Sequence, residues 1–154
     1  MRFHITAVTH QNAIRRTCEM IKRIGHLAFD VADMERSLHF YCGVLGFKKA
    51  FSIEDDHGNP WIEYIKVADG QFIELFYGGK QRPERPERPI GFSHLCLEVD
   101  SIEDIADHLK KNGVVLDVEP QQGKDLNWQC WARDPDGNRI EFMAMHPDSP
   151  QMKS

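Results

Sequence analysis

The sequence predicts an α+β protein built from two tandem βαβββ modules. The chain has 154 residues, of which 41% are hydrophobic and 28% charged, as is ordinary for a globular protein and not for a disordered one. Its sequence repeats itself once, at a spacing of 67 to 68 residues. Each copy of the repeat shows the same order of strand and helix patterns. A chain of this length buries roughly 70% of its unfolded surface, so it needs no disulfide framework.

The repeat is visible in two pairs of segments. Residues 24–31 (IGHLAFDV) align with residues 92–99 (FSHLCLEV) at an offset of 68, with His, Leu and Val coinciding. Residues 69–74 (DGQFIE) align with residues 136–141 (DGNRIE) at an offset of 67, with Asp, Gly, Ile and Glu coinciding. A single deletion therefore reconciles the two halves along their whole length.

Each copy begins with a strand, at 23–31 or 92–99, in which large apolar residues alternate with other residues. A helix then begins at a capping residue, Asp33 or Ser101, and ends at a glycine, Gly46 or Gly113. The expected apolar stripes of the two helices are Leu38, Tyr41 and Leu45, and Ile102, Ile105 and Leu109. The remaining strands are expected at 47–53, 60–67 and 71–77, and at 114–119, 127–133 and 138–145.

The segments outside the modules have a different composition. Residues 1–22 are expected to be an N-terminal extension, and residues 78–90 a Pro-rich charged linker between a first module at 23–77 and a second at 91–146. The four cysteines form no C-x-x-C pair, which favours reduced thiols and a cytoplasmic location. Nineteen basic against 24 acidic residues argue against nucleic-acid binding, and the short apolar runs argue against a membrane span.

Four residues of the repeat are candidate metal ligands: His26, Glu74, His94 and Glu141, at equivalent positions of the two copies. Strand alternation places each histidine on the face turned away from the helix. Each glutamate lies in an apolar strand, where a buried and unpaired carboxylate is costly, and a metal ion with histidine ligands removes that cost. Nitrogen and oxygen ligands without thiolate favour one divalent ion, and they leave Ni²⁺, Co²⁺, Mn²⁺, Fe²⁺ and Zn²⁺ open.

The hairpin turns predict the wall of a substrate pocket. With a three-residue loop at 135–137, Trp131 lies opposite Glu141, and the same register places Tyr64 opposite Glu74. Two residues along, Lys66 and Arg133 are positioned to attract an anionic substrate. A register slip of one residue would instead turn Trp61 and Trp128 inward.

The sequence resembles the vicinal oxygen chelate superfamily, and within it the glyoxalase I-like proteins, over about residues 22–145. The resemblance rests on both histidines, on Arg36–Tyr41 followed by Leu45-Gly46-Phe47, and on the two segments that end in Glu74 and Glu141. It implies two modules that form a cupped, incomplete barrel around one metal ion, held by the four candidate ligands. It also implies a homodimer, in which the linker could permit modules to exchange between chains.

The complete ligand set looks most like bacterial glyoxalase I, which implies a lyase or isomerase acting on a small substrate with vicinal oxygens. The hypothesis is that the ion stabilises an enediolate while Glu141 moves a proton, with Glu74 as its counterpart. Two alternatives stay open: a dioxygenase or other oxidoreductase, and a non-catalytic binding or resistance protein. Glutathione-using members carry Arg and Asn where this chain has Phe51 and Gly78, so the metal site is better supported than a glutathione substrate.

Overall fold

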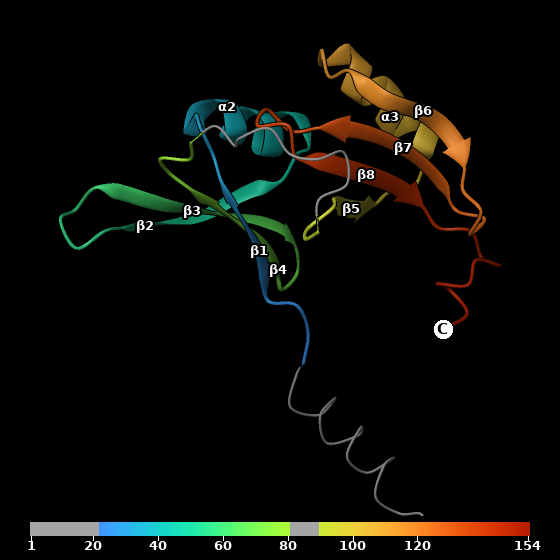
Figure 1. Cartoon of the computed structure of the whole chain (residues 1–154), viewed down its shortest axis with the longest axis horizontal. Helices are drawn as coiled ribbons and strands as arrows, with labels where there is room; N and C mark the ends of the chain where they lie inside the picture. The colour runs from blue at the N-terminus through green and yellow to red at the C-terminus, as the bar shows by residue number, and fades with distance from the viewer. Residues whose placement is uncertain (1–21, 81–89) are drawn as a thin grey trace, which may run out of the picture.

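The computed structural model describes residues 22–80 and 90–154, which form two four-stranded sheets with few helices and no closed barrel (Figure 1). The predicted α+β fold of two modules is therefore confirmed. The predicted extension at 1–22 and linker at 78–90 lie largely outside the described residues.

The two modules have the same topology. The first contains β1 (His26–Asp30), α2 (Met34–Leu38), η1 (His39–Val44), β2 (Lys48–Glu54), β3 (Pro60–Ala68) and β4 (Gln71–Phe76). The second contains β5 (Leu95–Glu98), α3 (Ile102–Lys111), β6 (Leu116–Gln122), β7 (Trp128–Arg133) and β8 (Arg139–Ala144). The sheet orders are β1-β4-β3-β2 and β5-β8-β7-β6, in which β1 and β5 run parallel to their neighbours and the other pairs are antiparallel.

Both predicted helix starts are present. The side chain of Asp33 accepts a hydrogen bond from the backbone N–H of Arg36 at 3.0 Å, and Ser101 accepts one from Asp104 at 3.1 Å. The first helix differs from the prediction in its second half, because η1 is a π-helix, which closes with a bond from the Leu45 N–H to the Phe40 carbonyl at 2.9 Å.

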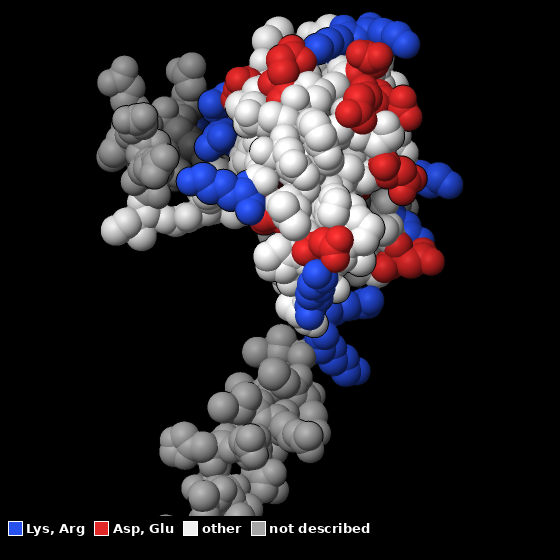
Figure 2. Space-filling model, turned by 90° about the vertical axis from the view of Figure 1, so that its right-hand side faces the viewer, with Lys and Arg blue, Asp and Glu red and all other residues white. Residues whose placement is uncertain are grey.

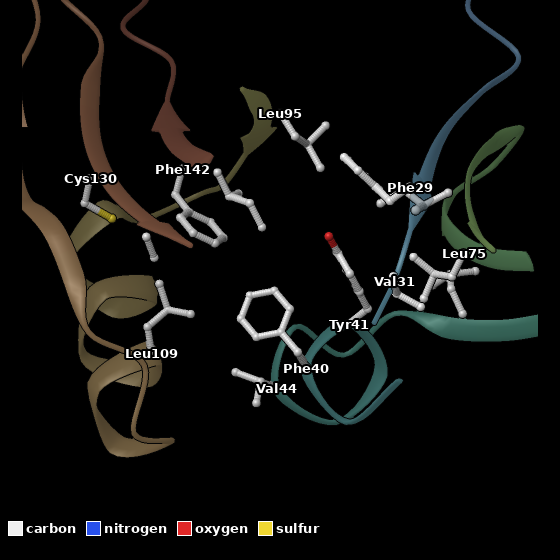
Figure 3. Packing of buried hydrophobic residues seen from close by; sticks show 14 of the residues in the cluster. Phe29, Val31, Phe40, Tyr41, Val44, Leu75, Leu95, Leu109, Cys130 and Phe142 are labelled. Atoms are coloured by element: carbon white, nitrogen blue, oxygen red, sulfur yellow. The ribbon is translucent and has the colours of Figure 1, made fainter. Parts of the chain in front are cut away.

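One hydrophobic core joins the two modules. Phe40 and Tyr41 of η1 lie between the first sheet and the second module, where Leu109 and Phe142 approach from the other side (Figure 3). The Tyr41 hydroxyl also donates to Asp134 at 2.8 Å across this junction, and Tyr41 is fully buried. The helices therefore pack the modules against each other, while the opposite faces of the two sheets remain outside this core.

The charged side chains are dispersed. On the face shown in Figure 2, Lys, Arg, Asp and Glu lie around the margin, and uncharged residues fill the centre. Charges of both signs occur along that margin, so the net charge of −5 forms no single field on this face. No helix within residues 22–80 and 90–154 is long and apolar enough to cross a bilayer.

Candidate metal centre

His26 and Glu74 form the first half of the candidate centre. His26 begins β1, and its Nε2 atom lies 3.3 Å from Oε2 of Glu74 on the neighbouring strand β4. The glutamate side chain is only 7% exposed, whereas the histidine is 49% exposed. Strand alternation explains this arrangement, because Phe29 and Val31 of the same strand segment point into the core and are buried. The pair therefore joins a buried carboxylate to an accessible imidazole.

His94 and Glu141 repeat this arrangement in the second module. The Nε2 atom of His94 lies 3.1 Å from Oε2 of Glu141, and their side chains are 32% and 14% exposed. His94 precedes β5 by one residue instead of lying within it, so this strand starts later than predicted. The edge of the Trp131 ring packs at 4.8 Å from the His94 ring, centroid to centroid, and restricts its orientation.

Each pair fits a divalent metal ion as half of a ligand set. Two ligand atoms at about 2.1 Å from one ion, at angles of about 90° to 109°, lie about 3.0 to 3.4 Å apart. The 3.3 Å and 3.1 Å separations of the two pairs both match one edge of such a coordination polyhedron. Neutral imidazole nitrogen and carboxylate oxygen also suit the same borderline divalent ions.

The two halves are not brought together within one chain. Across the described ranges 22–80 and 90–154, no group of three or more His, Cys, Asp or Glu side chains is clustered closely enough to hold a metal ion. Each histidine meets the glutamate of its own module, and the two pairs stay apart because η1 and α3 hold the modules against each other on their other faces. The described part of one chain therefore presents the four candidate ligands as two separate His–Glu pairs.

The hairpin register places the predicted aromatic residues on the sheet face that carries the candidate ligands of their module. We call this side of each sheet the ligand face. Tyr64 lies opposite Glu74, and Trp131 lies opposite Glu141, as the three-residue loop predicts. The Glu74 carboxylate opposite Tyr64, together with burial, raises the pKa of the tyrosine. The Trp131 indole N–H donates to Gln129 at 2.7 Å instead of to Glu141. Trp61, which the alternative register would turn inward, is 47% exposed.

The two predicted cations of the pocket are engaged with acidic side chains. Lys66 lies 2.5 Å from Asp69, and Arg133 lies 2.8 Å from Asp117. Both ion pairs lie at the protein surface, so they neutralise the two cations only weakly. Cys96 lies beside Glu141 in the pairing of β5 with β8, and burial together with that carboxylate raises the pKa of its thiol to about 12. Cys96 is thus protonated at neutral pH and is no nucleophile there.

Three residues of the ligand face were not predicted as site residues. Phe51 stacks on Tyr64 with ring centroids 4.2 Å apart, and Phe72 meets the same ring edge-on at 6.3 Å. Arg139 lies over the ring of Trp131, with its guanidinium carbon 4.5 Å from the ring centroid. Strand parity could have found two of them, because Phe72 and Arg139 each precede a candidate ligand glutamate by two residues.

Comparison with known proteins agrees with this fold. A family model described as Glyoxalase/Bleomycin resistance protein/Dioxygenase superfamily matches residues 23–142. A lactoylglutathione lyase of Escherichia coli O157:H7 is 27% identical over 126 residues, covering 79% of this chain and 91% of that protein. A lactoylglutathione lyase of Schizosaccharomyces pombe is 30% identical over 152 residues, covering 84% of this chain but 49% of that protein.

A solved structure shows the same arrangement. The crystal structure of a glyoxalase family protein from Enterococcus faecalis matches with a TM-score of 0.68 and 25% identity, covering 80% of this chain and 98% of that chain. The family model spans both modules and both His–Glu pairs. This chain therefore belongs to the Glyoxalase/Bleomycin resistance protein/Dioxygenase superfamily.

Proposed function

We propose that this protein is a metal-dependent lyase or isomerase, similar to glyoxalase I, that acts on a small substrate with two adjacent oxygen atoms. One observation carries the proposal: the repeat places a His–Glu pair on each module, and each pair has the separation of two ligands on one ion. The likeness to lactoylglutathione lyases at 27% to 30% identity supports the reaction class.

We further propose that a second copy of the chain completes the centre in a homodimer. Within one chain the pairs stay apart, and the His26 side chain is 49% exposed. The strands that carry or follow the histidines, β1 and β5, are the edge strands of their sheets and are open to pairing. In a two-fold dimer, His26 and Glu74 of one chain would meet the partner's His94 and the partner's Glu141, which gives two equivalent centres.

The protein's own groups would then orient the substrate and move its proton. A bound divalent ion would supply Lewis-acid stabilisation of negative charge on the substrate oxygens. Glu141 is the more exposed of the two carboxylates, at 14% against 7% for Glu74. The greater exposure favours Glu141 as the group that transfers the proton, with Glu74 as its counterpart.

A cytoplasmic location fits this chemistry. Cys42, Cys96 and Cys130 are free cysteines, which supports our assignment of the protein to the reducing cytoplasm.

The test begins with elemental analysis of the purified protein and a hemithioacetal isomerisation assay with several thiols. The Glu141→Gln variant is expected to keep its ion and to lose about 100-fold to 10,000-fold in turnover, because the amide cannot accept the proton. The matched Glu74→Gln variant is expected to lose less turnover and more of its metal affinity. Full turnover in Glu141→Gln would contradict the assigned base, and O₂ consumption with bound iron would favour a dioxygenase instead.

A further inference from the structure

Arg139 is a cation on the ligand face whose charge no described side chain neutralises. It begins β8, two residues before Glu141, and strand geometry therefore places it about 7 Å from that ligand on the same face. It is exposed, and within residues 22–80 and 90–154 no carboxylate lies within ion-pair distance of it. Its neighbour across the hairpin, Arg133, differs in this respect because it is bound to Asp117 at 2.8 Å.

The Trp131 ring fixes where this cation lies. The guanidinium of Arg139 rests 4.5 Å from the ring centroid, and the indole is itself held by its hydrogen bond to Gln129 and by the His94 ring. A guanidinium stacked on an aromatic face keeps its N–H edge free in its own plane. That edge matches the two oxygens of a carboxylate. Because Arg139 brings a single positive charge to this wall, and Glu98 and Glu141 of the same face are acidic, the wall suits a monoanion better than a doubly charged phosphate.

The first module carries a different wall at the equivalent positions. In the repeat, Phe72 corresponds to Arg139 and Tyr64 corresponds to Trp131, each at an offset of 67. Phe51 stacks on Tyr64 at 4.2 Å, and Phe72 packs edge-on against the same ring. The two copies of the ligand face have thus diverged, so that one half is aromatic and the other presents a cation.

We infer that the substrate is an amphipathic monoanion, whose carboxylate is bound by Arg139 and whose apolar or aromatic body packs, across the proposed dimer, on the partner's Phe51 and the partner's Tyr64. This inference rests on the proposed function, because it places the carboxylate about 7 Å from substrate oxygens held near Glu141.

The test compares two probes that differ only in charge: 3,4-dihydroxybenzoate and its neutral amide. Both carry vicinal oxygens on an aromatic ring, and calorimetric titrations of the full chain are run with and without Zn²⁺ under anaerobic conditions. The acid is expected to bind about tenfold to a hundredfold more tightly than the amide. Arg139→Gln is expected to remove this preference, because it weakens binding of the acid far more than binding of the amide. The control Arg133→Gln is expected to keep the preference, because that guanidinium is bound to Asp117.

The metal dependence separates this inference from the proposed function. If the acid still binds more tightly than the amide but Zn²⁺ raises the affinity of neither probe, the metal centre is contradicted and the role of Arg139 is supported. If Zn²⁺ raises the affinity of both probes equally and the acid binds no more tightly than the amide, the role of Arg139 is overturned and the metal centre stands. Failure of both probes to bind in either state would overturn the inference.

Discussion

Asp134 is a buried acceptor that joins the turn of the second module to the helix of the first. It accepts hydrogen bonds from the Tyr41 hydroxyl at 2.8 Å and from both the backbone and the side-chain N–H of Asn138 at 2.8 Å. Burial and the nearby Asp134 raise the pKa of Tyr41, which is therefore a neutral donor. The sequence predicts only a turn at Asp134, because its partner on η1 is 93 residues away.

Removal of this one hydroxyl tests the junction. We expect Tyr41→Phe to lower the free energy of unfolding by about 1 to 2 kcal/mol, because Asp134 loses one buried donor and keeps the bonds from Asn138. Urea denaturation at neutral pH measures the change, and metal affinity serves as the control that should stay constant. A variant as stable as the unmodified protein would show that the bond contributes nothing to the junction.

Glu63 makes the stability of the folded protein depend on pH. Burial alone would raise the pKa of its carboxyl, but hydrogen bonds from Lys49, Ser52 and Tyr77 outweigh that effect and lower the pKa below its usual value of 4.5. A lowered folded-state pKa stabilises the protein above the unfolded pKa, and this stabilisation disappears as the pH falls through the folded pKa.

We therefore expect the unmodified protein to lose stability between about pH 5 and pH 3 more steeply than Glu63→Gln does. Denaturant midpoints measured across that range for both proteins give the two slopes. At neutral pH the variant should be the less stable of the two, because the glutamine side chain cannot form the ion pair with Lys49. Equal slopes of stability against pH for the two proteins would mean that Glu63 does not cause the loss of stability in acid.

At the scale of elements, local signals predicted strands, caps and hairpins better than helix packing. The Asp-Pro-Asp-Gly turn fixed the register of β7 and β8, so Trp131 lies opposite Glu141 as expected. The first helix was predicted as one amphipathic element with Leu45 in its stripe. The wider π-helical turn of η1 instead buries Phe40 and Val44, and Leu45 is only half-buried. A π-helix has no reliable local pattern, since packing across the junction stabilises it.

Helix α3 depends on one fully buried side chain. We expect Leu109→Ala to lower the free energy of unfolding by about 2 to 5 kcal/mol, because Leu109 is 0% exposed in the core that both modules share. The control is Val115→Ala just beyond the same helix, where the side chain is 82% exposed and the expected change lies within about 0.5 kcal/mol. Equal effects of the two substitutions would contradict the assigned core.

At the scale of the whole molecule, the repeat predicts which residues are equivalent but not how the two copies meet. The repeat makes His26 equivalent to His94 and Glu74 equivalent to Glu141. In the structure, each histidine pairs with the glutamate of its own module. The spatial relation of the pairs depends on contacts far apart in sequence, such as the bond from His108 to the Val44 carbonyl at 2.8 Å. Those contacts leave no periodic pattern, so the separation of the pairs was not predictable.

A mixing experiment tests the shared centre most directly. One variant carries His26→Ala and Glu74→Gln, the other carries His94→Ala and Glu141→Gln, and neither is expected to bind Zn²⁺ tightly alone. If each centre combines the first module of one chain with the second module of its partner, co-refolding equal amounts produces heterodimers with one intact centre. We predict recovery of about one tightly bound ion for every four chains. No recovery in mixtures that do form heterodimers would contradict a metal centre built between two chains.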